Sequence, residues 1–236
     1  MRFDGRVNDE MRPITIVPGY LDHPEGSALI EMGRTRVICT ATIEERVPFW
    51  LRDQAQGWVT AEYGMLPRAT HQRTSRETGG PRARTQEIRR LIGRSLRAGV
   101  DLDLLGERTL TIDCDVLQAD GGTRTASITG GYVAMAISLR KLIKGGLLAP
   151  GVLRSPIAAI SVGVVQDEVL LDLNYHEDSQ AQVDFNVVMN ARGKYVEVQG
   201  TAEQGTFTRE VMDQLLNLAE HGIEGLFKLQ REAYGR

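Results

Sequence analysis

The stretch from residue 108 to residue 142 constrains the fold most, because it joins a strand to a long helix through a glycine-rich turn. Apolar and polar residues alternate from Arg108 to Gln118, which is the period of a β-strand with one buried face. Asp120-Gly-Gly-Thr123 is typical of a turn, and a helix is expected from about Ala126 to Leu142, ending near Gly145-Gly146. The chain is therefore expected to combine sheets and helices, with this turn at a strand-to-helix junction.

Each half of the chain contains strand-like runs together with amphipathic helix patterns. The runs span residues 27–32, 36–41 and 57–63 in the first half, and 157–165, 169–175, 183–189 and 195–199 in the second. Further helices are expected from about Thr85, as the N-cap, to Ala98 and after Thr208. Residues 147–156 contain two prolines and are typical of a linker. The length suits one large domain, 1–236, or two small fused halves, and the two halves, at about 1–146 and 157–236, have a similar pattern.

Composition and charge exclude several classes of protein. The chain has 236 residues and is 42% hydrophobic, which is enough for a core, and 25% charged residues do not indicate disorder. Cys39 and Cys114 lie among apolar residues and are expected to be reduced core residues of a cytoplasmic protein. The first residues show no apolar signal-peptide segment, and no uncharged run approaches the roughly 20 residues that a membrane span needs. We therefore expect no association with a membrane.

Positive charge is concentrated in one segment of an otherwise acidic chain. Residues 68–97 contain nine arginines and two glutamates, although the whole chain has a net charge of −3. Residues 67–84 are rich in Arg, Thr, Ser, Gly and Pro and are expected to form a long mobile loop. This segment predicts a local anion-binding surface, and the alternative is a solvated run of charge. The loop arginines are Arg68, Arg73 and Arg76, and a helical stripe opposite the apolar face consists of Arg90, Arg94 and Arg97.

The turn before the long helix has the chemistry of an anion-binding site. Gly121 and Gly122 let the backbone approach a ligand, and the free N–H groups and the dipole of a helix N-terminus favour negative charge. Arg124 adds a rigid fork of donors that suits phosphate. The turn is not a P-loop, because the Gly-Lys-Ser/Thr ending is absent. An ordinary helix-capping turn is the alternative that the pattern leaves open. The hydroxyls expected to assist are those of Thr123, Thr125 and Ser127.

Two pairs of carboxylates are candidates for a metal site. The apolar residues between 183 and 189 point one way along a strand, so Asp184 points the other way. Asp178 can share a metal with Asp184 only if the intervening residues curl back, because a continuous strand would hold the two roughly 20 Å apart. Asp113 and Asp115 form a rival pair on one strand face. Two carboxylates in oxygen-rich surroundings suit Mg²⁺, and polar residues on a solvated strand face are the alternative.

Four stretches of the chain resemble the ribonuclease PH family, and the resemblance runs almost from end to end. It implies an α+β fold in which a β-α-β unit resembling the ribosomal protein S5 domain 2-like fold is duplicated. It also implies a homohexameric ring built as a trimer of dimers. The expected activity is phosphorolysis of the 3′ ends of tRNA precursors, with ribosomal RNA as a further candidate substrate and nucleoside diphosphates as products. The stretches are Glu62–His71, Arg84–Arg94, Asp113–Gly130 and Val196–Glu203.

The site residues that the resemblance implies come from both halves of the chain. The family's phosphate-binding arginine and its Gly-Thr-Arg phosphate loop are matched, and so are its paired aspartates, which serve as ligands of Mg²⁺ and as catalytic carboxyls. Inorganic phosphate is the implied co-substrate. The matching residues are Arg84, Gly122, Thr123 and Arg124 for phosphate, and Asp178 and Asp184 for the metal and catalysis.

Two other functions are weighed against phosphorolysis. A hydrolytic exonuclease would use water as nucleophile and release monophosphates, and an inactive ring subunit would only bind RNA. The joint presence of the phosphate-binding arginines and the aspartate pair argues against the inactive subunit. The related polynucleotide phosphorylases carry a lysine where this chain has Asn186, which favours the ribonuclease PH branch. The loop arginines are expected to bind the RNA body, and the alternative is that they hold subunits together.

Overall fold

The structure, a computed structural model, describes residues 2–203 and 205–235, and within them each half of the chain forms its own sheet. The strands are β1 (Ile14–Pro18), β2 (Gly26–Met32), β3 (Thr35–Glu44), β4 (Trp58–Met65), β5 (Thr109–Gln118), β6 (Ile157–Val165), β7 (Glu168–Leu171), β8 (Val183–Asn190) and β9 (Lys194–Ala202). The first sheet has the order β1-β2-β3-β5-β4, and the second has the order β7-β6-β8-β9. Neighbouring strands are antiparallel except β4 and β5, which are parallel.

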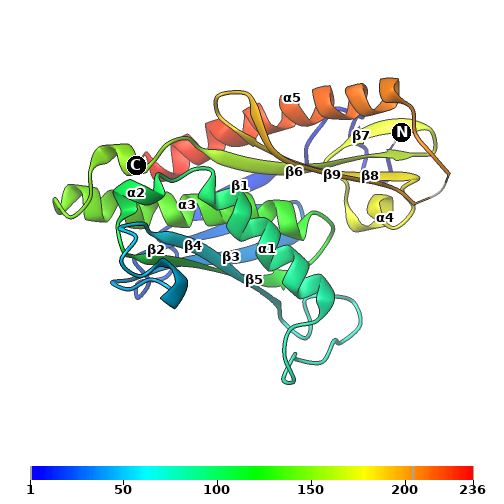
Figure 1. Cartoon of the computed structure of the whole chain (residues 1–236). Helices are drawn as coiled ribbons and strands as arrows, with labels where there is room; N and C mark the ends of the chain where they lie inside the picture. The colour runs from blue at the N-terminus through cyan, green and yellow to red at the C-terminus, as the bar shows by residue number, and fades with distance from the viewer. Residues whose placement is uncertain (1, 204, 236) are drawn as a thin grey trace.

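The helices and sheets stack in layers (Figure 1). The helices are α1 (Ala83–Arg97), α2 (Leu102–Leu105), α3 (Thr123–Lys144), α4 (Tyr175–Asp178) and α5 (Arg209–Tyr234), with short 3₁₀ turns at Phe49–Leu51 and Pro150–Val152. Helix α3 lies between the two sheets, and α1 packs beside it on the first sheet. Helix α5 covers the other face of the second sheet. The middle of the second sheet is therefore covered on both faces, and β6 is buried along its whole length, whereas β9 at the edge is partly exposed.

The first part of helix α3 is buried on all sides because it lies between the two sheets. Every residue from Thr125 to Ala136 is buried. Small residues make this possible: a Cβ added at Gly130 would lie 2.7 Å from the Ile30 side chain on β2. The alternation predicted for β8 holds as well, since Val183 and Phe185 pack toward α5 while Asp184 and Asn186 face a cleft. The N-terminus of α3 and one face of β8 are thus brought together.

The predicted α+β fold is confirmed, with four local differences. Helix α3 begins at Thr123 rather than Ala126, and α1 begins at Ala83, so Thr85 is not its N-cap. Strand β7 ends at Leu171, and Tyr175 belongs to α4. The sequence patterns missed β1, whose five residues pair with β2. The duplication of one unit across the halves 1–146 and 157–236 stays a prediction.

None of the helices in the described ranges combines the length and the apolar composition that a membrane crossing would require.

Candidate active site

A cleft of about 1010 Å³ opens where α3 begins, and it brings together residues from both halves of the chain. All six residues predicted for phosphate, metal and catalysis line it, and none of the three loop arginines does. The predicted residues in its wall are Arg84, Gly122, Thr123, Arg124, Asp178 and Asp184. A smaller hollow of about 350 Å³ shares Arg124, Asp184 and Asn186 with the cleft and continues it toward β9.

The turn before α3 has a backbone that only glycine adopts easily. Gly121 and Gly122 have φ values of 75° and 65°, in the left-handed region. Thr35 braces the turn: its hydroxyl donates to the Gly121 carbonyl at 2.7 Å and accepts from the Asp120 N–H at 2.9 Å. The first N–H groups of α3 have no acceptor within the helix. These N–H groups, together with the dipole of a 22-residue helix, have the chemistry that suits an anion at the edge of the cleft.

Only one of the three hydroxyls expected at this turn lines the cleft. The Thr123 hydroxyl lies 2.8 Å from the Tyr63 hydroxyl on β4. Thr125 and Ser127 are buried and donate instead to helix carbonyls, at Gly122 and Thr123, at 2.9 and 2.8 Å. The expectation that they face the ligand is therefore wrong, because each satisfies its hydrogen bond with the preceding turn of its own helix.

Arg84 and Arg124 place two positive charges on the same cleft. Arg84 lies in the first turn of α1 and is exposed. Arg124, in the first turn of α3, is more enclosed, and its side chain is 19% exposed. It lies 3.4 Å from the Gln199 side chain and 3.5 Å from Glu87, so its fork is only weakly engaged and can turn to a ligand.

The two aspartates meet because the chain between them turns back. Asp178 ends α4, and the following turn is fixed by the Gln182 N–H, which donates to the Val164 carbonyl at 2.8 Å. Asp184 then lies on the cleft face of β8. Asp113 and Asp115, the rival pair, lie on β5 and do not line the cleft.

Burial and mutual repulsion perturb the acidic groups of the cleft. Burial, followed by the charge of Asp178, raises the pKa of Asp184 to about 6. Burial also raises the pKa of Asp178, while the charges of Arg84 and Arg124 oppose the shift. An ionised pair here is costly unless a cation lies beside it.

The chemistry of the donors fits a magnesium ion held by two carboxylates. One oxygen of Asp184, Oδ1, is buried without a hydrogen-bond partner, and the Asn186 amide reaches the other oxygen at 3.5 Å. No group of three or more His, Cys, Asp and Glu side chains suited to a metal occurs in residues 2–203 and 205–235. Mg²⁺ is commonly held by one or two carboxylates together with substrate phosphates, so a pair is sufficient.

The loop arginines lie on a long loop that projects from the body of the molecule below α1 (Figure 1). All three are exposed, and the hydrogen bond that the structure gives them is a 3.3 Å contact from Arg68 to the His71 carbonyl. The base of the loop, at Thr70–Gln72, lines the cleft. The loop therefore runs along the cleft, but its three arginines do not line it.

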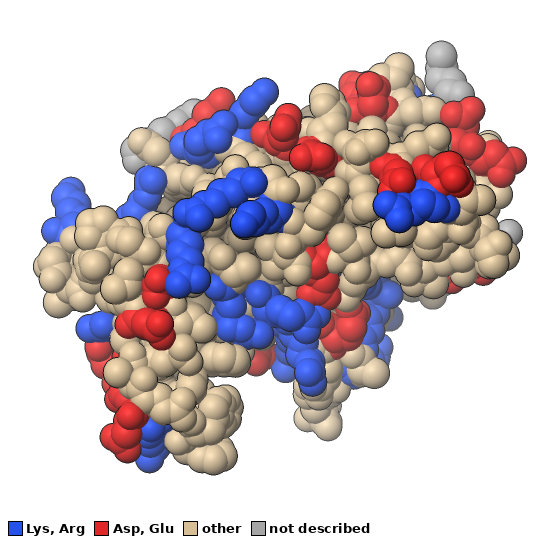
Figure 2. Space-filling model, turned by 45° about the horizontal axis from the view of Figure 1, so that its top comes forward, with Lys and Arg blue, Asp and Glu red and all other residues tan. Residues whose placement is uncertain are grey.

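The helical stripe is only partly free. Figure 2 shows a band of Lys and Arg side chains over the middle of one face. On α1, Arg94 is paired with Glu197 at 2.6 Å. Arg97 packs over the Trp58 ring at 4.3 Å and donates to the Val59 carbonyl. Arg94 and Arg97 of the expected basic stripe are therefore engaged by contacts within the chain.

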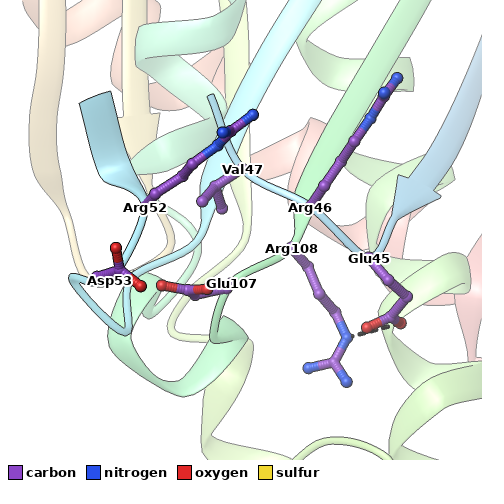
Figure 3. A pocket seen from close by; sticks show the side chains of 7 residues that line it. All are labelled: Glu45, Arg46, Val47, Arg52, Asp53, Glu107 and Arg108. Atoms are coloured by element: carbon purple, nitrogen blue, oxygen red, sulfur yellow. Dashed lines mark hydrogen bonds and ion pairs between the residues drawn. The ribbon is translucent and has the colours of Figure 1, made fainter. Parts of the chain in front are cut away.

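A separate hollow of about 610 Å³ lies away from this cleft, beside the ends of β3 and β5 (Figure 3). Its wall combines acidic and basic side chains, and Arg108 is hydrogen-bonded to Glu45 at 2.9 Å. It is wide open and contains no aspartate pair or anion-binding turn. We assign it no chemistry.

Several residues in or beside the cleft were not singled out from the sequence. The Tyr63 hydroxyl lies 2.8 Å from the Thr123 hydroxyl and orients it. Burial raises the pKa of Tyr63, and the positive charges of Arg84 and Arg124 oppose this rise. The Ser161 hydroxyl is buried without a partner in the wall of the cleft. His71 and Tyr175 also line it. No spacing rule marks them, since each is brought in by packing between segments far apart in the chain.

Comparison with known proteins identifies the class that this fold and cleft define. The model of domain 1 of the 3′ exoribonuclease family matches residues 10–141, and the model of domain 2 matches residues 155–222. Together they cover most of the chain, which therefore belongs to the 3′ exoribonuclease family.

Within that family, the chain is similar to ribonuclease PH. It is 58% identical to ribonuclease PH of Bacillus subtilis and of Bacillus velezensis, over 100% of this chain and 97% of each relative. Among solved structures it matches rice (Oryza sativa) Rrp46 with a TM-score of 0.79 and 19% identity, covering 98% of both chains. It matches the Archaeoglobus fulgidus exosome with RNA bound to the active site with a TM-score of 0.80 and 22% identity, over 96% of this chain and 91% of the other. These two structures support the fold.

Proposed function

We propose that the chain is a phosphate-dependent 3′→5′ exoribonuclease that shortens tRNA precursors and releases nucleoside diphosphates. The observation that carries the proposal is the meeting of an anion-binding turn, two arginines and two carboxylates in one cleft. RNA is the substrate and inorganic phosphate the co-substrate of the activity that its 58% identical relatives are named for. The arginines distinguish this activity from hydrolysis, because water as a nucleophile needs no second anion site.

The reaction exchanges one phosphate linkage for another. An oxygen of inorganic phosphate attacks the phosphorus of the last phosphodiester, and the bond from that phosphorus to the 3′ oxygen of the preceding nucleotide breaks. The terminal nucleotide leaves as a diphosphate, and the 3′ oxygen takes up a proton. The step is close to balanced in energy, so it runs backwards when diphosphates are abundant.

The residues of the cleft have two tasks in this reaction: they bind charged groups, and they transfer a proton. Thr123, the N–H groups of α3 and the forks of Arg84 and Arg124 bind the attacking phosphate. Asp178 and Asp184 would hold Mg²⁺, which supplies positive charge to offset two phosphates brought together. We assign to one of these carboxyls the protonation of the leaving 3′ oxygen.

Product analysis tests the proposal. The substrate is a tRNA with a short 3′ extension, incubated with and without inorganic phosphate. Shortening that requires phosphate and yields nucleoside diphosphates supports the proposal. Equal shortening without phosphate, with monophosphate products, would establish the hydrolytic alternative. Binding of RNA with no shortening under either condition would establish the inactive subunit.

The remaining parts of the proposal concern assembly, RNA contact and location. The chain acts as one domain with two similar halves, and six copies form a ring as a trimer of dimers. The loop arginines bind the backbone of the tRNA body, which their exposure supports. The two cysteine thiols are free and buried, which supports a reducing, cytoplasmic location. Light scattering at assay concentration tests the ring, and a fully active monomer would overturn it.

A further inference from the structure

The first twelve residues of the chain bury three arginines behind the cleft. Arg2, Arg6 and Arg12 are 7%, 7% and 5% exposed, although arginine is rarely buried without a partner. Their acidic partners include Asp172 and Glu177, which are 0% and 4% exposed. Both acids lie in the segment that leads from β7 to the end of α4. None of these five residues lines the cleft, so their role is not contact with a ligand.

Arg12 connects the two walls of the cleft through one guanidinium group. Its Nε and Nη2 donate to the two oxygens of Asp172 at 2.9 and 2.6 Å. Its main-chain N–H also donates to Asp172, at 2.9 Å. The remaining nitrogen, Nη1, donates to the carbonyl of Asp120, the residue that begins the phosphate-binding turn. One side chain therefore holds both the turn and the segment that carries the catalytic carboxylate.

The two walls are in direct contact at the point where Arg12 joins them. A Cβ added at Gly121 would lie 2.6 Å from the carbonyl oxygen of Leu173 and 2.9 Å from the N–H nitrogen of Tyr175. Asp172 itself has a φ of 53°, a left-handed backbone that residues other than glycine adopt rarely. The chain thus reverses at Asp172 through an unfavourable backbone conformation. The Asp172 carboxylate points at the Arg12 guanidinium, which holds this turn in place.

Arg2 holds Glu177, the residue directly before Asp178, in a similar way. Its guanidinium binds both oxygens of Glu177, each at 2.7 Å. Glu177 in turn completes a capping box with Asn174 at the start of α4. A four-residue helix cannot hold its own shape, so these contacts determine where Asp178 points.

We propose that Arg12 is a positioning residue for phosphorolysis, setting the spacing between the phosphate-binding turn at Gly121-Gly122 and the carboxylate of Asp178. The inference rests on the proposed function, since it concerns the same cleft. The turn would hold the attacking phosphate, and Asp178 and Asp184 would hold the Mg²⁺ that offsets its charge. A displacement of about 1 Å between such elements can lower a rate by about 100-fold.

The test compares Arg12→Lys with Arg6→Lys. Lysine keeps a positive charge opposite Asp172, but it lacks the fork that reaches Asp172 and Asp120 together. Arg6 is the matched control: it is as buried, comes from the same segment and contacts the Asp172 carbonyl and Glu177, but it does not contact Asp120. Both variants should lower Tm. Only Arg12→Lys should raise the KM for phosphate, by about 10–100-fold.

A binding readout separates positioning from loss of fold. Inorganic phosphate should raise the Tm of the wild type and of Arg6→Lys by similar amounts, and raise that of Arg12→Lys much less. Asparagine tolerates the left-handed backbone, so Asp172→Asn should behave like Arg12→Lys. The double variant should lose no more of the Tm response to phosphate than either single variant does.

Three outcomes decide between the inference and the proposed function. If the wild type shortens RNA without phosphate, the proposed function fails. If the wild type needs phosphate but Arg12→Lys and Arg6→Lys have equal KM values for it, only the positioning role is overturned. A raised KM and a weakened response of Tm to phosphate in Arg12→Lys alone would confirm the positioning role.

Discussion

Replacing Asp184 with asparagine should stabilise the fold while it abolishes turnover. Burial and the neighbouring Asp178 raise the pKa of Asp184 from its ordinary value of 3.8 to about 6, so the ionised form is less stable in the folded chain than in the unfolded one. A shift of about two pKa units corresponds to about 3 kcal/mol at neutral pH. Because the side chain keeps some access to water, we expect the Asp184→Asn variant to gain about 1–3 kcal/mol in free energy of unfolding without metal.

The gain should depend on pH with a definite sign. Between pH 3.8 and about 6 the folded chain binds more protons at Asp184 than the unfolded chain does. The wild type therefore loses stability as the pH rises through this window, and asparagine, which cannot ionise, does not. The difference between variant and wild type should be small at pH 4 and fully developed by pH 7.

Urea unfolding in the presence of a chelator measures this difference, at one protein concentration for all samples. Asp22→Asn is the matched control, because Asp22 is exposed in a loop far along the chain from the cleft residues. A variant less stable than the wild type at pH 7, or an equal difference at both pH values, would refute the electrostatic account. Near-normal turnover of Asp184→Asn with Mg²⁺ would refute its place in the reaction.

Three further predictions concern the phosphate site and the loop. Arg124→Ala should raise the phosphate concentration needed for half-maximal rate about 10–100-fold, since a charged hydrogen bond contributes about 1.5–3 kcal/mol; an unchanged phosphate dependence would exclude its role. Replacing the three loop arginines with alanine should weaken tRNA binding and flatten the log-affinity against log-salt slope by about 0.7–0.9 per contact, and leave cleavage of a short oligonucleotide unchanged. Dissociation of the ring with equal loss on both RNAs would instead assign them to subunit contacts. Gly121→Ala, with its Cβ 2.6 Å from a backbone carbonyl, should lose activity, whereas Gly146→Ala, equally left-handed but with open space around it, should not.

The longer strands and helices could be predicted because their apolar residues recur at the period of a strand or a helix. Strand β6 has the bounds expected from the sequence, and β5 and β8 differ by one residue at an end. Strand β1 was missed because five residues are too few to establish a period, and its position depends on pairing with β2. Helix α4 was missed for a similar reason: four residues are held by Glu177 and its partners rather than by their own propensity.

The cleft could be predicted only in part from its residues. Alternation along β8 placed Asp184 on a polar face, but the choice of Asp178 as its partner came from the family resemblance. The helix period alone did not reveal that Thr125 and Ser127 bond to their own helix. The contact between Arg12 and Asp172 joins residues 160 positions apart, and nothing in the local pattern of either segment indicates the other.

The origin of the oxygens in the released nucleotide tests the central claim most directly. A tRNA with a 3′ extension is incubated with inorganic phosphate labelled with ¹⁸O at all its oxygens, and the masses of the released nucleotides are measured by mass spectrometry. Attack by phosphate predicts nucleoside diphosphates whose terminal phosphoryl group and bridging oxygen carry the full label. Release of nucleoside monophosphates without label, which take up ¹⁸O only when the water is labelled, would contradict the account.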